Sequence, residues 1–336
     1  MCAAVTSELI PEMLREYGDV TRAALNDYLP TRTPRRHLYD LLADYPDRGG
    51  KMMRPSLCIA TARAFGAQLD DALRSAAAIE MLHNALLIHD DIEDDSEERR
   101  GKPTLHMLHG VPLAINAGDM LTLMSLRPLM ENRMRIGPRI SLRILEETER
   151  AALESAEGQA MELGWRRDNI NDLTESDYLL MVLKKTCWFG TIYPSRVGAM
   201  IGTRDSVDLE RFVRFGFFLG AAFQIQDDLL NLVADKRYGK ERNGDIWEGK
   251  RTLMLIRLFN EASSEEKQRL NAIMAHSRCD RAAEDVTWIR ALMDRYDCID
   301  YARKFAHALP APPRMSFQLS TVTSRIPATS ASSKGL

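Results

Sequence analysis

Hydrophobic residues recur at intervals of three and four positions over most of the chain, which is the spacing of one face of an α-helix. Strand signals are nearly absent, because no Asn-Gly or Asp-Gly turn separates two alternating runs. The pattern therefore predicts an all-α protein whose clearest helices cover Leu57–Phe65, Ala72–Ile88, Leu142–Leu163, Tyr178–Trp188, Leu209–Val233 and Leu253–Phe259.

Short segments rich in Gly, Pro and Asn separate these helices, at 47–55, 99–104, 109–112 and 237–245. Such short connections, without an internal repeat, favour a single helical bundle over residues 1–309. The last segment differs, because Pro, Ser, Thr and Ala dominate residues 310–336 without helical periodicity. We therefore predict a disordered tail over 310–336.

Composition narrows the class of protein. The net charge is −3, from 45 basic and 48 acidic residues, so no basic surplus indicates a nucleic-acid partner. The five cysteines form no CxxC pair, which argues against a zinc site or a disulfide framework and favours a reducing, cytoplasmic setting. No signal peptide is expected, and the most apolar stretch, 215–225, is too short to span a bilayer.

A first cluster of carboxylates closes the apolar segment 72–88. Asp90 and Asp94 are four positions apart, so their side chains lie on one helical face, where like charges repel each other. A divalent cation would compensate this repulsion, and dense oxygen ligands suit Mg²⁺ bridged to phosphate. A solvated acidic helix end is the plainer alternative, but the basic turn Arg99-Arg100 that follows favours a metal and phosphate site.

A second helix repeats this arrangement. Asp227 and Asp228 close the apolar run that ends at Ile225, and Gln224, Asp227 and Asn231 share a helical face. Two Asp-Asp clusters that each end an apolar helix indicate two walls of one cavity, with Mg²⁺ between them. Basic residues that could hold diphosphates lie near glycines or close to other helix ends, although each alone could be an ordinary surface feature: Lys51, Arg54, Lys184, Lys185, Lys240 and Lys250.

In combination, the segments GGKMMRP, HDDIEDDSEERRG, KKT, FQIQDD and GDIWEGKRT resemble the polyprenyl synthetase family, the trans-isoprenyl diphosphate synthases, over about residues 35–305. The resemblance implies an all-α isoprenoid synthase bundle around a deep central cavity, usually as a homodimer. It also implies Mg²⁺-dependent condensation of isopentenyl diphosphate with an allylic diphosphate such as dimethylallyl, geranyl or farnesyl diphosphate. Ionisation of the allylic diphosphate would precede attack by the isopentenyl double bond, and the released pyrophosphate would take the proton.

The resemblance assigns roles by position. It implies metal ligation by Asp90, Asp94 and Asp227, supported by Asp91 and Asp228. It implies isopentenyl diphosphate binding by Lys51, Arg54, His83 and Arg100, and allylic diphosphate binding by Arg99, Lys185, Lys240 and Lys250. Thr186 and Gln224 match positions near the reacting carbons. Two features depart from the family pattern, namely Asn231, where many members have Asp, and the atypical tail from Pro310.

The resemblance also implies which residues limit the chain length of the prenyl diphosphate product, namely those just before the first carboxylate cluster. In the family, an aromatic residue four or five positions before the first Asp stops elongation at farnesyl length. Here these positions hold Leu86 and Ala85, so we expect geranylgeranyl diphosphate, with farnesyl and geranylfarnesyl diphosphate as alternatives. A class I terpene cyclase and an inactive partner subunit are the competing functions. The second Asp-Asp pair argues against a cyclase, and the presence of both clusters argues against an inactive subunit.

Overall fold

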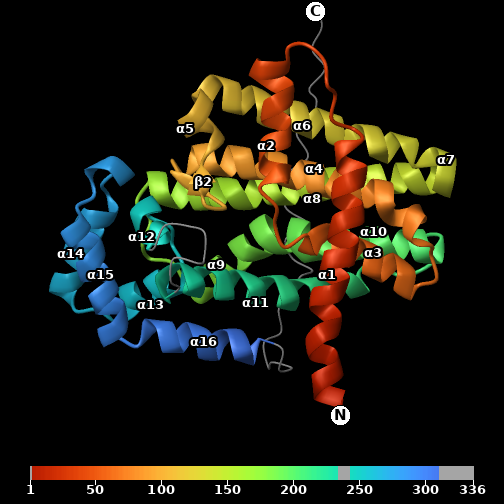
Figure 1. Ribbon diagram of the computed structural model, residues 1–336. Coiled ribbons are helices and arrows are strands. Elements are labelled where there is room, and N and C mark those ends of the chain that lie inside the picture. The colour runs from red at the N-terminus through yellow and green to blue at the C-terminus, as the bar shows by residue number, and fades with distance from the viewer. Residues whose placement is uncertain (1, 234–242, 310–336) are drawn as a thin grey trace, which may run out of the picture.

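The computed structural model describes residues 2–233 and 243–309, which are predominantly helical (Figure 1). The sequence-based prediction of an all-α fold is confirmed. The one exception among the described residues is a short antiparallel pair of two-residue strands at the basic turn, β1 (Glu98–Arg99) and β2 (Lys102–Pro103). The helices, in chain order, are α1 (Cys2–Asn26), η1 (Arg35–Tyr39), α2 (Asp40–Asp47), α3 (Met53–Ala64), α4 (Leu69–Glu93), α5 (Leu105–His109), α6 (Val111–Glu131), α7 (Arg133–Ile136), α8 (Pro138–Arg167), α9 (Glu175–Val182), η2 (Leu183–Ile192), α10 (Tyr193–Thr203), α11 (Arg211–Val233), α12 (Gly244–Glu248), α13 (Leu253–Glu261), α14 (Ser264–Met274), η4 (Arg278–Asp280), α15 (Ala283–Arg295) and α16 (Cys298–Ala308).

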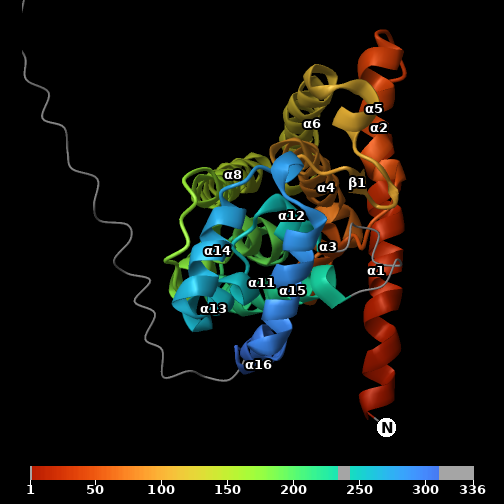
Figure 2. The same cartoon turned by 90° about the vertical axis from the view of Figure 1, so that its left-hand side faces the viewer.

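Helix α4 is the central helix on one side of the bundle. It packs against α6, α3 and α1, and α3 in turn packs against α10 (Figure 1). A capping box between Gln68 and Asp71 fixes its first turn, because each side chain bonds the backbone amide of the other residue. Helix α1 lies on the outside of the bundle (Figure 2). The first carboxylate cluster therefore stands at the C-terminal end of a helix that other helices cover.

The helix predicted over Tyr178–Trp188 is present, but its winding changes at Leu183. Residues 175–182 form α9, and η2 continues directly from it as a π-helix. A π-helix has a wider turn than an α-helix, so it changes which side chains face each neighbour and often occurs at functional sites. Segment η2 packs between α8 and α11, and it holds Lys184, Lys185 and Thr186 inside the helix rather than after it.

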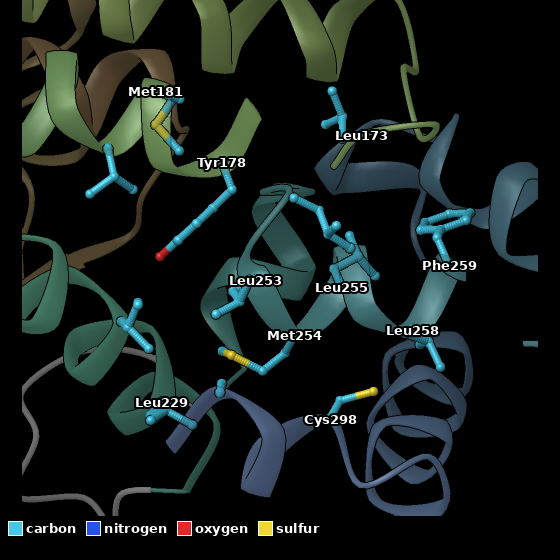
Figure 3. Close-up of a cluster of buried hydrophobic side chains, with 14 of the residues drawn as sticks. Leu173, Tyr178, Met181, Leu229, Leu253, Met254, Leu255, Leu258, Phe259 and Cys298 are labelled. Carbon is cyan, nitrogen blue, oxygen red and sulfur yellow. The ribbon is translucent and has the colours of Figure 1, made fainter. Parts of the chain in front are cut away.

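Three main clusters of buried apolar residues hold these helices together. The largest joins α9, α11, α13, α15 and α16, and Figure 3 shows part of it, including Met254, Leu255 and Cys298. The other two lie on different sides of α4. One includes Leu82 and residues of α3, α8 and α10, with Leu86 packed against it. The other includes Ala85 and residues of α2, α5 and α6.

Within the described residues, no helix combines the length and the hydrophobicity that a membrane span requires. The segment 310–336, for which we predicted a disordered tail, lies outside the described residues.

Candidate active site

The two aspartates at the end of α4 differ in their surroundings although they are adjacent in the sequence. Asp91 is fully buried, and it accepts hydrogen bonds from Tyr45 Oη at 2.5 Å and from Arg99 Nε at 2.9 Å. Burial raises the pKa of Asp91, although Arg99 and Tyr45 favour its charged form. Asp90 is half-buried and lies near Arg99 and Lys185, each with a nitrogen 3.4 Å from a carboxylate oxygen. Asp91 therefore supports the structure, and Asp90 faces the site.

Asp94 follows α4 as its C-cap and is almost completely buried. Its carboxylate lies 2.5 Å from Arg166 Nη1 and 2.6 Å from Lys250 Nζ. Burial alone would raise the pKa of Asp94, but Lys250, Lys185 and Arg166 outweigh it, so this pKa lies below the usual value. Asp94 is therefore held as a carboxylate by cations from α8, η2 and the segment before α13.

Lys185 and Lys250 connect the acidic groups of several helices. Lys185 pairs with Glu162 of α8 as well as with Asp90, and Lys250 Nζ lies 2.7 Å from Glu248 as well as near Asp94. Burial by itself would lower the pKa of each lysine, but the surrounding carboxylates raise it above its usual value. Both lysines thus stay charged, and a phosphate could compete with carboxylates for them.

The second carboxylate cluster lies near the C-terminal end of α11, across from η2. Asp228 is buried and accepts hydrogen bonds from Gln224 Nε2 at 2.7 Å and from Tyr178 Oη at 2.8 Å. Burial raises the pKa of Asp228 to about 6, despite these two hydrogen bonds. Gln224 in turn accepts a hydrogen bond from Thr186 Oγ1 at 2.8 Å. The structure thus brings the predicted Thr186, Gln224 and Asp228 into one polar chain.

A cavity of about 50 Å³ lies between these groups. Its lining includes predicted site residues from η2, α11 and the segment before α13, namely Lys185, Thr186, Gln224, Asp227, Asp228 and Lys250. The volume accommodates only a few water molecules. A diphosphate bound here would compete with Glu162 for Lys185 and with Glu248 for Lys250.

A second basic group lies around His83 on the middle of α4. Arg54 Nη1 lies 3.2 Å from His83 Nε2, and Arg100 donates to the carbonyl of Tyr45 at 2.9 Å. Burial, assisted by Arg54 and Arg100, lowers the pKa of His83 well below its usual value. Lys51 is exposed and lies over the ring of Phe223, with Nζ 5.3 Å from the ring centre. His83 is therefore neutral at pH 7, and the arginines carry the positive charge of this group.

Several polar residues at the site were not predicted from the sequence. Gln159, which donates to Glu93 at 2.5 Å, and Glu162 reach the site from α8, and Tyr178 reaches it from α9. Glu80 is buried on α4, where the charges of Arg54 and Arg100 partly offset the burial that raises its pKa. The spacing of Glu162 is a sequence signal that could have identified it. Glu162 is separated by three or four positions from Gly158 and Trp165, so it shares their helical face, which is buried in α8.

The last two sequence-based assignments concern Lys240 and Asn231. Lys240 lies outside the described residues. Asn231, at the position where many family members have Asp, accepts a hydrogen bond from the backbone amide of Asp245 at 3.1 Å. Its side-chain oxygen therefore holds the start of α12 in place.

The donor set fits a divalent cation shared with a ligand. In the described part of the chain, no three His, Cys, Asp or Glu side chains converge as a ready-made metal cage. Mg²⁺ usually takes one or two protein carboxylates and completes its shell with water and phosphate oxygens. Asp90 of α4, Asp94 directly after α4 and Asp227 of α11 could provide such oxygens in separate places around Lys185 and Lys250.

The chain is similar to proteins of known family. A family model described as polyprenyl synthetase matches residues 35–293. A short chain isoprenyl diphosphate synthase of Methanothermobacter thermautotrophicus is 33% identical over 302 residues, which cover 88% of each chain.

Two solved structures are also similar. The geranylgeranyl pyrophosphate synthetase of Pyrococcus horikoshii has a TM-score of 0.79 and 34% identity, with 90% of each chain covered. A polyprenyl synthase of Caulobacter crescentus, complexed with calcium and isoprenyl diphosphate, has a TM-score of 0.76 and 28% identity, with 89% of this chain and 88% of that chain covered.

Proposed function

The chain belongs to the polyprenyl synthetase family, and from this premise we propose that it lengthens an allylic isoprenyl diphosphate by adding isopentenyl diphosphate. The observation that carries the proposal is the meeting of two carboxylate-bearing helix ends, α4 and α11, around Lys185 and Lys250. Acids and lysines at such density suit metal-bound diphosphate. Dimethylallyl, geranyl and farnesyl diphosphate are the candidate primers.

Enzymes of this family use divalent metal ions, and we propose Mg²⁺ here, with Asp90, Asp94 and Asp227 as its ligands. When bound, Mg²⁺ supplies positive charge that stabilises the departing diphosphate. Lys185 and Lys250 add fixed positive charge at the same place, and Arg99 and Lys240 complete the proposed allylic diphosphate site. Lys51, Arg54, His83 and Arg100 form the proposed isopentenyl diphosphate site.

The residues between these two sites position the reacting carbons and exclude water. Thr186 and Gln224 line the cavity with polar atoms, and Leu82 and Leu86 lie on an apolar side of α4. An allylic cation survives longer where water is excluded. The proton lost after the new bond forms would pass to the released pyrophosphate. The protein thus contributes orientation, charge and shielding.

A direct assay tests the proposal. The full chain is incubated with Mg²⁺, isopentenyl diphosphate and, in separate reactions, dimethylallyl, geranyl or farnesyl diphosphate, and the products are separated by chromatography. An elongated diphosphate is the expected product. A hydrocarbon product would indicate a terpene cyclase, and the absence of any product would indicate an inactive partner subunit, so either result would contradict the proposal.

We propose geranylgeranyl diphosphate as the main product. Leu86 and Ala85 stand four and five positions before Asp90, and neither is aromatic. The structure separates them, because Leu86 packs with the α3, α8 and α10 cluster, whereas Ala85 is fully buried in the cluster that contains Leu121 of α6. Leu86 is thus the better candidate for a wall of the elongation path, and Ala85 for a packing residue.

Leu86→Phe is expected to shorten the main product to farnesyl diphosphate while total turnover persists, because the larger ring would block a path that runs past Leu86. Ala85→Phe is expected to lower the free energy of unfolding by about 1–3 kcal/mol, because it overpacks a filled cluster. Chromatography of the products and thermal unfolding measure the two effects. An unchanged product distribution in Leu86→Phe would place the end of the path elsewhere.

We also propose a homodimer that forms through α6. One side of this helix exposes Ile115, Leu123, Leu126 and Met130, and Met134 of α7 extends the patch. A monomer rarely exposes a large apolar patch unless a partner covers it. Because the family resemblance implies a homodimer, a second copy of the chain is the proposed partner.

The double variant Leu123→Glu with Met130→Glu is expected to be monomeric, because it would place four charges in a symmetric interface. Phe215→Glu is the control, since Phe215 is also exposed but lies on α11. Analytical ultracentrifugation measures the mass of each variant. A double variant with the wild-type mass would show that α6 is not the interface.

A further inference from the structure

Tyr178 belongs to the large apolar cluster by its ring but not by its hydroxyl. The side chain is buried, and Figure 3 shows its oxygen directed away from Leu255. That oxygen donates a hydrogen bond to Asp228 at 2.8 Å. Helix α9 fixes the position of Tyr178, because a capping box between Thr174 and Asp177 sets the first turn just before it. The hydroxyl therefore reaches the second carboxylate cluster from a rigid support.

In the hydrogen bonds that link Asp228, Gln224 and Thr186, the donor and the acceptor of each bond are determined. A carboxylate only accepts hydrogen bonds, so both Tyr178 and the side-chain nitrogen of Gln224 must donate to Asp228. The carbonyl end of Gln224 then faces Thr186, whose hydroxyl must donate to it. Thr186 thereby commits its hydrogen to Gln224, and its oxygen keeps only lone pairs for other contacts.

Each oxygen of Asp228 is used in this chain, Oδ1 by Gln224 and Oδ2 by Tyr178. If the bond from Tyr178 were lost, Oδ2 would lack this fixed donor, and the carboxylate could rotate about its Cβ–Cγ bond. The amide of Gln224 would then no longer be restricted to one orientation. Side chains held by two such bonds are fixed more tightly than those held by one.

We propose that Tyr178 is a positioning residue, which acts through Asp228 to fix the orientation of the Gln224 amide and of the Thr186 hydroxyl beside the reacting carbons. The inference rests on the proposed function, because it assigns a purpose to the polar side of the same cavity. A lone pair of Thr186 that faces the cavity would favour developing positive charge on the allylic carbons, whereas a hydroxyl hydrogen turned toward them would oppose it.

Tyr178→Phe tests the inference, since it removes one oxygen and keeps the ring. We expect kcat to fall about tenfold, with less than about a twofold change in KM for either diphosphate. Tyr28→Phe is the matched control, because Tyr28 also donates to a carboxylate at 2.8 Å, that of Glu131, at a separate surface groove. This control is expected to keep the wild-type kcat. A wild-type kcat in Tyr178→Phe would overturn the inference.

A double-mutant comparison separates positioning from general support. In a Thr186→Val background, Tyr178→Phe is expected to change kcat by less than about twofold, because its effect passes through the missing hydroxyl. A further tenfold loss would show that Tyr178 acts on the structure at large and would overturn the inference.

The amide of Gln224 provides a readout that does not depend on activity. Selective ¹⁵N labelling of glutamine side chains, with Gln224→Met to assign the signal, follows this amide by NMR. Tyr178→Phe is expected to speed hydrogen exchange of the Gln224 amide about tenfold, whereas Tyr28→Phe leaves it unchanged. An unchanged exchange rate in Tyr178→Phe would reject the positioning role. Elongation by the wild-type chain is measured separately. A wild-type chain without elongation would contradict the proposed function, whereas an unchanged exchange rate would contradict only the positioning role of Tyr178.

Discussion

Replacing Asp90 or Asp227 by alanine is expected to lower kcat by about a thousandfold or more, because each change removes a proposed ligand of the Mg²⁺ that stabilises the departing diphosphate. Asp90 is a clean probe of this role. Without it, Lys185 keeps its pair with Glu162, and Arg99 keeps its pair with Asp91, so the fold should survive. Steady-state turnover in chelator-treated buffer to which Mg²⁺ is returned measures the effect, and circular dichroism confirms the fold.

Asp95→Asn is the matched control for these variants. Asp95 lies next to Asp94, but its side chain is 72% exposed, and asparagine tolerates the left-handed backbone found there. It should keep turnover within about twofold of the wild type, as is usual for an exposed surface change. If Asp90→Ala and Asp227→Ala also kept near-normal turnover, the metal assignment would be wrong.

Gly158→Ala is expected to lower both stability and turnover. A Cβ at Gly158 would stand 2.2 Å from the backbone nitrogen of Lys185 and 2.7 Å from its Cα. Backbone atoms cannot move aside as a flexible side chain can, so α8 and η2 would separate at the residues that carry Lys185 and Thr186. We expect the free energy of unfolding to fall by about 3 kcal/mol. We also expect turnover to fall more than about tenfold, because a small displacement of positioning groups reduces catalysis strongly.

Gly164→Ala is the control on the same helix. Nothing lies within 4 Å of a Cβ at Gly164, so alanine should raise the free energy of unfolding by up to about 1 kcal/mol through its better helix propensity. Chemical denaturation and steady-state kinetics compare the two variants. If Gly158→Ala matched Gly164→Ala in both measurements, the close approach of α8 to η2 would have no role in the site.

The amino-acid sequence alone determined the helical architecture and indicated which residue types could form the proposed site. Helix type follows from the local spacing of apolar residues, so the segments 72–88, 142–163 and 253–259 each lie within an observed helix. The type of site follows from which side chains end those helices. Carboxylates that directly follow a buried run require compensating charge wherever the chain folds, and this requirement is the basis of the predicted metal and diphosphate site.

Tertiary structure alone decided the part that each residue plays. Asp90 and Asp91 are neighbours in the sequence, but only packing turned Asp91 toward Tyr45 and left Asp90 at the site. Similarly, Ala85 and Leu86 belong to different clusters on different sides of α4. A local pattern shows which face of a helix is buried, but not which distant helix covers that face.

Because a local pattern does not show which distant helix covers a face, some residues of the site were not predicted from the sequence. Glu162 lies on a buried stripe whose partner, Lys185, is 23 positions further along the chain. Tyr178 looks like an ordinary core aromatic until α11 places Asp228 opposite its hydroxyl, 50 positions later. The winding of η2 has no signal in hydrophobic spacing and becomes visible only where α8 and α11 pack against it. Such pairings depend on how helices pack in three dimensions, because side chains far apart in the chain meet only through the fold.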